Sequence, residues 1–135
     1  MSAAAAVPQL KQLTPVLVVD SVEPCLAFWT ERFAFTAENQ VPGPDGKLIF
    51  ASAKKGGIEV MYETRKAAVA DNVITAKELD GRSCVLFIAV ESLDQVERAL
   101  AGVPVLKARH KTSYGSLEVY VREPGGHVVG FAQFA

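Results

Sequence analysis

Three charged residues interrupt strands that are otherwise apolar, and any chemistry would rest on these side chains. Glu59 stands between apolar residues, and Glu118 and Arg122 flank Tyr120 at alternate positions. Alternate residues of a β-strand point to one face, so Glu118, Tyr120 and Arg122 share a face. A carboxylate in an apolar pocket has a raised pKa and can act as a general base. The structural alternatives are a solvated charge for Glu59 and an ion pair between Glu118 and Arg122.

Other chemical signatures are absent from the sequence or weak. Cys25 and Cys84 are isolated, and we expect two reduced, buried thiols of a cytosolic protein. No phosphate-binding glycine loop, nucleophile elbow or triad spacing is present. His110 falls in a basic loop over residues 108–111, which either closes over a cleft or is simply exposed.

The composition excludes several classes of protein. The chain has 135 residues, of which 50% are hydrophobic and 21% charged, as in one soluble globular domain. A formal net charge of −1 provides no basic surface for nucleic acid. No apolar run approaches the roughly 20 residues that span a membrane. Residues 1–7 lack the basic flank and apolar core of a signal peptide. We therefore expect a cytoplasmic protein that binds neither nucleic acid nor a membrane.

The two halves of the chain repeat each other at a spacing of 71 residues. Residues 19–22 and 90–93 both read apolar, acidic, serine, apolar, and the apolar runs 58–61 and 129–132 have the same spacing. A repeat of this length indicates a duplicated half-domain rather than a solenoid. Each half reads as a strand, a helix and three strands. This order predicts an α+β fold of two tandem βαβββ modules that form a pseudo-symmetric concave sheet with helices on the outside.

The boundaries follow from apolar periodicity and turn residues. We predict one domain over residues 13–134, with a first module at 13–62, a linker at 63–82 and a second module at 83–134, after an N-terminal lead-in at 1–12. The predicted strands of the first module are 13–19, one that begins at 34–37, 47–52 and 58–62, and those of the second are 84–90, 105–108, 116–122 and 127–132. Helices are predicted after Ser21 and Ser92, and a short one near 66–70.

These patterns together resemble a known family, the vicinal oxygen chelate superfamily of glyoxalases, bleomycin-resistance proteins and extradiol dioxygenases. The first helix carries Leu26-Ala27-Phe28-Trp29. The closing segment, residues 114–127, is similar to the family's ending G-x-x-E-x-x-V-R-D-P-x-G-H, with Glu123 in place of Asp. The resemblance covers residues 13–134. It implies the fold, but one fold hosts many activities.

The resemblance also implies where a metal would be held. Enzymes of the superfamily usually bind a divalent metal through one His or Glu from each of four strands, and these positions correspond here to Thr14, Glu59, Val85 and Gly130. The repeat agrees with this mapping, because the second pair lies 71 residues after the first. Only Glu59 is a good ligand, whereas catalytic metal sites need about three. We therefore predict no metal and no cofactor, as in the metal-free bleomycin-resistance-like members.

Strand alternation then identifies the wall of the cavity. If Glu59 points into the concave side, the residues that share its face are Val16, Val18, Met61, Phe87, Ala89, Val128 and Ala132, joined by Glu118, Tyr120 and Arg122. The opposite face, which suits packing under helices, carries Leu17, Val19, Ile58, Val60, Leu86, Ile88, Val90, Val119, Val121, Val129 and Phe131. The predicted ligand-binding residues are Glu59, Met61, Phe87, Glu118, Tyr120, Arg122 and His110.

The leading hypothesis is a metal-free small-molecule binding protein without catalytic residues. It would sequester an aromatic or cationic, antibiotic-like ligand, the cationic preference resting on Glu59 and Glu118. One alternative is an enzyme of the superfamily, a lyase, isomerase or oxygenase, that acts on a small metabolite with Glu59 as general base. Another is a structural or regulatory module that binds nothing. The resemblance further implies a homodimer whose clefts are completed by the partner chain.

Overall fold

The structure, a computed structural model, describes residues 7–9, 11–71 and 84–135. It contains two four-stranded sheets with the strand orders β1-β4-β3-β2 and β5-β8-β7-β6. In each sheet the first strand of the module pairs in parallel with the last, and the other neighbours are antiparallel. The same topology therefore occurs twice, and the predicted α+β class with two βαβββ modules is confirmed.

The first module is built around a long amphipathic helix. Its elements are β1 (Val16–Val19), α1 (Val22–Phe33), β2 (Thr36–Pro42), β3 (Leu48–Lys55) and β4 (Ile58–Thr64). One side of α1 is buried, and its residues Val22, Cys25 and Trp29 are fully inaccessible. The predicted short helix follows as α2 (Arg65–Asp71). Residues 63–64 of the predicted linker belong to β4 instead, and its residues 72–82, like residues 1–6 and 10 of the lead-in, lie outside the described residues.

The second module repeats this order with a shorter helix. Its elements are β5 (Val85–Ala89), α4 (Leu93–Ala99), β6 (Val105–Lys111), β7 (Ser116–Arg122) and β8 (Val128–Phe134). The Ser92 hydroxyl caps α4 by accepting a hydrogen bond from the Gln95 N–H at 3.2 Å. The sequence placed His110 in a loop after a short strand. This prediction is wrong, because β6 continues to Lys111, with an irregular register between Lys107 and His110.

The helix side of both sheets forms the core, largely as strand alternation predicted. Leu17, Val60, Val121 and Phe131 are at most 7% exposed. Ile58 is an exception at 40%, because it lies at the beginning of β4 near the hairpin turn. The prediction for Cys84 is also wrong, since this thiol is exposed while that of Cys25 is buried. None of the helices within the described ranges is long and apolar enough to cross a membrane.

A chain of buried hydrogen bonds joins the two modules. Trp29 Nε1 donates to the Tyr62 hydroxyl at 2.9 Å, and this hydroxyl donates to Glu123 Oε2 at 2.7 Å. His127 holds the other carboxylate oxygen through its backbone N–H at 2.6 Å. Burial, followed by the charge of Glu123, raises the pKa of Tyr62, so its hydroxyl stays protonated and donating. The stacked rings of Phe33 and Phe131, with centroids 5.4 Å apart, add an apolar contact across the same junction.

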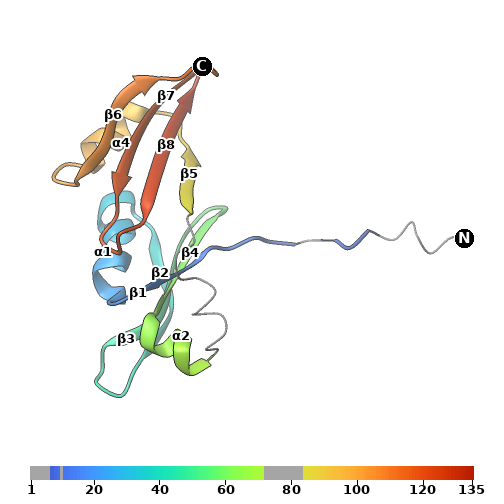
Figure 1. Ribbon diagram of the computed structural model, residues 1–135, viewed down its shortest axis with the longest axis vertical. Coiled ribbons are helices and arrows are strands. Elements are labelled where there is room, and N and C mark those ends of the chain that lie inside the picture. Colours follow the sequence, from blue (N-terminus) through green and yellow to red (C-terminus); the bar gives the residue numbers. More distant parts are fainter. Residues whose placement is uncertain (1–6, 10, 72–83) are drawn as a thin grey trace, which may run out of the picture.

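The two sheets lie one above the other along the long axis of the molecule, with α1 beside their junction (Figure 1). The described residues just before β1 leave the body as an extended arm (Figure 1). Apolar side chains on the faces away from the helices remain exposed in both sheets. Val16 is 43% exposed in the first sheet, and Val85 and Phe87 are 51% and 49% exposed in the second.

Candidate functional site

An aromatic ring covers Gly130 on the concave face of the second sheet. Tyr120 of β7 and Phe87 of β5 are the cross-strand neighbours of Gly130, one on either side. A Cβ atom added to Gly130 would lie 2.4 Å from Cε2 of Tyr120. Only glycine leaves room for the ring to lie directly on the β8 backbone at this position.

A buried carboxylate holds this ring in place. Glu118 is 1% exposed and accepts hydrogen bonds from the hydroxyls of Tyr114 at 2.6 Å, Ser116 at 2.7 Å and Tyr120 at 2.8 Å. Burial alone would raise the pKa of Glu118, but the three hydroxyl donors outweigh it and leave this pKa below its usual value. The hydrogen bond to Glu118 in turn raises the pKa of Tyr120 to about 12. At neutral pH the site therefore holds an ionised carboxylate and protonated tyrosines.

His110 extends the aromatic surface. Its ring stacks on Tyr120 with centroids 6.2 Å apart and planes 22° apart. Its Nδ1 atom lies 2.8 Å from the Ala108 carbonyl oxygen. Because a carbonyl can only accept, we assign a proton to Nδ1, which donates to Ala108. The His110 ring is thus held beside the tyrosines by a backbone hydrogen bond and by stacking.

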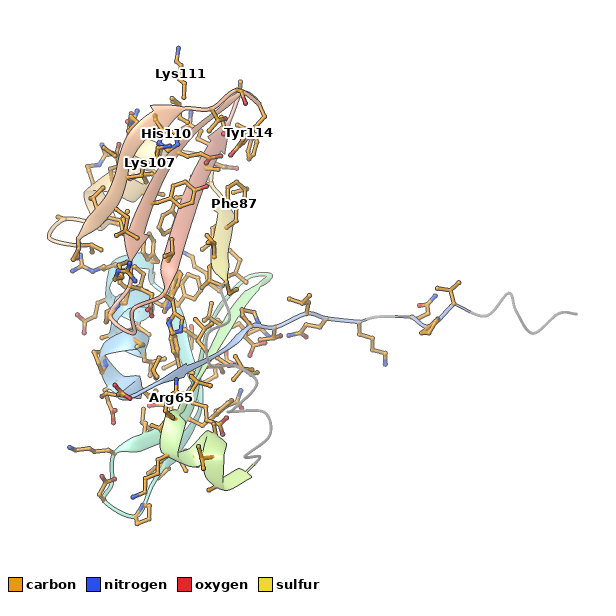
Figure 2. The ribbon with its side chains drawn as sticks, in the orientation of Figure 1. Arg65, Phe87, Lys107, His110, Lys111 and Tyr114 are labelled. Atoms are coloured by element: carbon orange, nitrogen blue, oxygen red, sulfur yellow. The ribbon has the colours of Figure 1, made fainter. Side chains whose placement is uncertain are left out.

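The irregular register of β6 brings Lys107 to the same place. Lys107 is opposite Tyr120 and His110 is opposite Glu118, although an odd spacing of three residues would put their side chains on opposite faces of a regular strand. A β-bulge resolves this conflict by placing an extra residue between paired positions. The resulting depression has a volume of about 530 Å³, and Figure 2 labels several of its residues. Its lining comprises Lys107, His110, Lys111, Thr112, Ser113, Tyr114, Glu118 and Tyr120.

The structure separates the predicted site residues into groups. Glu118, Tyr120 and His110 line one depression, whereas Glu59 and Phe87 line another of about 400 Å³ between β4 and β5. There Glu59 accepts a hydrogen bond from Gln12 Nε2 at 2.9 Å.

The other two predicted residues lie outside both depressions. Met61 is on the first sheet, opposite Ser52 and Val16. Arg122 donates to the Gly126 carbonyl at 2.6 Å and faces a third depression, shared with Phe28 of α1. The alternative of an ion pair between Glu118 and Arg122 is therefore wrong, because hydroxyls satisfy this carboxylate and a carbonyl binds the guanidinium.

The family's metal positions do not form a metal site here. Gln12 bridges Glu59 and the Thr14 hydroxyl, Val85 and Gly130 have no donor atom, and Tyr120 covers Gly130. Within the described ranges, no three His, Cys, Asp or Glu side chains converge in a way that could hold a metal ion. The residues present do not fit the divalent metal of the family's enzymes.

Sequence patterns did not identify five residues that line the depression, namely Lys107, Lys111, Thr112, Ser113 and Tyr114. Lys107 reaches it through the bulge, which alternation cannot reveal. Tyr114 precedes β7 in a turn, where strand alternation assigns no face. The spacing of four residues between Tyr114 and Glu118 does not by itself predict a contact. The hydroxyl of Tyr114 reaches Glu118 only because the turn folds it back toward β7.

Comparisons with known proteins agree on the fold. The family model described as Glyoxalase/Bleomycin resistance protein/Dioxygenase superfamily matches residues 9–131. An uncharacterized protein of Mycobacterium bovis and one of Mycobacterium tuberculosis are each 32% identical to this chain over 118 residues, or 85% of its length. The matched region covers 78% of the first protein and 69% of the second. Two solved structures have similar folds at 17% identity. A glyoxalase/bleomycin resistance protein/dioxygenase family enzyme from Burkholderia phytofirmans has a TM-score of 0.73, with 90% of this chain and 97% of that chain covered. A lactoylglutathione lyase from Agrobacterium tumefaciens has a TM-score of 0.70, with 93% and 95% covered.

Proposed function

Because the chain belongs to the glyoxalase/bleomycin resistance protein/dioxygenase superfamily, we propose that it binds a small aromatic, antibiotic-like molecule on the concave face of its second sheet, without a metal. The observation that carries this proposal is the Tyr120 ring on Gly130. At a position where the family's enzymes place a metal ligand, this chain has a flat aromatic surface instead.

The surrounding rings support a stacking ligand. Tyr114, Phe87 and Phe134 are 60%, 49% and 49% exposed, and His110 already stacks on Tyr120. Each aromatic contact with a planar ligand contributes about 0.5–1.5 kcal/mol beyond the area that it buries. The hydrogen bond to Glu118 fixes the Tyr120 ring in advance, so little side-chain entropy is lost when a ligand binds.

A ligand screen followed by truncation tests the proposal. Compounds of the glycopeptide, quinoxaline and aromatic-metabolite classes are screened for a rise in melting temperature, because a ligand that binds only the native state stabilises it. Calorimetry with the best compound then compares the Tyr120→Ala and Phe87→Ala variants with Leu106→Ala, an exposed β6 truncation outside the depression. We expect the two ring variants to bind more weakly by about 1–3 kcal/mol while they remain folded. Parent-like affinity in both would contradict the proposal.

An enzyme of the same superfamily that acts on a small metabolite is the second candidate. The observation that favours it is the His110 ring at the edge of the depression, because an imidazole nitrogen is the commonest general base of enzymes. Glu59, the base that the sequence indicated, already accepts a hydrogen bond from Gln12. Conversion of a bound compound that stops in the His110→Asn variant would select the enzyme over the binding protein.

We also propose a cytoplasmic homodimer. The free thiols of Cys25 and Cys84 suit a reducing compartment. The exposed apolar side chains on both concave faces provide a surface that a second copy could cover. In this arrangement the partner's first module would close the depression over the second sheet.

A further inference from the structure

We infer that the ligand is an aromatic anion of the carboxylate class, whose charge is bound by Lys107 and Lys111 at the rim of the Glu118 depression. This inference rests on the proposed function and refines it. It also reverses the cationic preference that the sequence indicated, for reasons given by the contacts of Glu118.

The charge of Glu118 is not presented to a ligand. Both of its oxygens accept hydrogen bonds from protein hydroxyls, and only 1% of the residue is exposed. A ligand cation would have to displace the Tyr114 or Tyr120 hydroxyl in order to reach the carboxylate. Replacing a bound donor in this way gains little, because the existing charge-assisted hydrogen bond is lost.

The cations around the depression are available. Lys107 and Lys111 are exposed and line it, and in the part of the chain that the structure describes neither has a carboxylate partner. Their neighbour Arg109 differs, since its guanidinium forms ion pairs with Asp94 and Glu97 of the helical layer. The irregular register of β6 therefore brings Lys107 beside the aromatic rings while Arg109 pairs with the helix α4, and Lys111, which is opposite Leu117 at the end of β6, lines the edge of the depression.

This arrangement selects a ligand chemistry. An aromatic ring that stacks on Tyr120 and His110 places its substituents within the depression that the two lysines line. Two ammonium groups against one shielded carboxylate give an excess of positive charge at this rim. An anionic substituent is attracted there, and a cationic one is repelled.

Three compounds with the same ring system and different charges test the inference. The affinities of 2-naphthoate, 2-naphthamide and 2-naphthylmethylammonium are measured by calorimetry at low ionic strength with the full chain. We expect naphthoate to bind most tightly and to lose this advantage as salt is added. Lys107→Ala and Lys111→Ala should each weaken naphthoate by up to about fivefold, as for a partly solvated charge pair, and leave the amide unchanged.

Two further variants complete the design. Lys47→Ala removes the same charge from an exposed turn of the first module and should leave all three affinities unchanged. Lys107→Glu reverses one charge and should move the preference toward the ammonium compound. If the amide or the ammonium binds at least as tightly as naphthoate and Tyr120→Ala weakens every compound, the anion inference is wrong while the aromatic site stands. If none of the three compounds binds, both proposals are wrong.

Discussion

At the scale of single residues, the Tyr120 ring can lie on the β8 backbone only because residue 130 is a glycine. We predict that Gly130→Ala destabilises the protein by about 1–3 kcal/mol, because the new methyl group displaces the ring and breaks its hydrogen bond to Glu118. In a Tyr120→Ala background the same substitution should cost almost nothing. Urea denaturation of the four proteins of this cycle measures the coupling. Gly57→Ala, whose added Cβ meets open space, is the control; equal costs in both backgrounds would show that the ring does not press on Gly130.

Gly130 also bears on the metal content of the protein. We predict that protein purified without chelators carries no stoichiometric Zn, Ni, Fe or Mn at the four family positions, because Val85 and Gly130 offer no donor atom. Elemental analysis checks this prediction. About one equivalent of metal that disappears in the Glu59→Ala variant would refute it.

At the scale of elements, regular alternation allowed prediction and irregular backbone did not. The faces of β4, β7 and β8 could be assigned from the sequence, since Val60, Val119 and Phe131 are buried as expected. The bulge in β6 could not be predicted, because an extra residue between paired positions does not change the pattern of polar and apolar residues. Arg122 has the predicted alternation, yet the Gly126 carbonyl of the adjoining turn holds its guanidinium. Alternation places a side chain on a face and does not determine its partner.

Glu123, in the turn between β7 and β8, supplies the carboxylate that joins the two modules. We therefore expect the stability of the protein to depend on pH through this group. Burial would raise the pKa of Glu123, but hydrogen bonds from His127 and Tyr62 lower it below its usual value. Its contribution is therefore present above the unfolded pKa of about 4.3 and lost as the pH falls through the folded value. We predict that Glu123→Gln costs about 1–3 kcal/mol near pH 7 and less below about pH 4. Urea denaturation of the parent and the variant at both pH values measures this loss of unfolding free energy. A loss that is the same at both pH values would count against an ionised Glu123.

At the scale of the whole molecule, the two modules share a topology but differ in their roles. The first carries the long helix and the tryptophan of the junction, whereas the second carries the tyrosines and lysines of the depression. Both leave apolar side chains exposed on their concave faces, Val16 in one and Phe134 in the other. This distribution is the physical ground for expecting a second copy of the chain.

We predict a homodimer at micromolar concentration, measured by light scattering. Val85→Glu and Phe134→Glu should shift the protein toward the monomer, because each places a charge on a covered apolar surface. Val105→Glu is the matched control, since Val105 is 55% exposed but is the strand neighbour of the helix-side residue Val121. A monomer mass for the parent chain would exclude this assembly.

Trp29, which donates a hydrogen bond to Tyr62 at the junction of the modules, is also a fluorescent probe of that junction. Trp29 is the only tryptophan of the chain, and it is fully buried where the two modules meet. Its fluorescence therefore has a single source, whose emission wavelength should move to the red when water enters the junction. A ligand on the concave face of the second sheet lies on the other side of the β-strands and should leave this wavelength unchanged. Separation of the modules and occupation of the depression can then be followed independently in the same unlabelled protein.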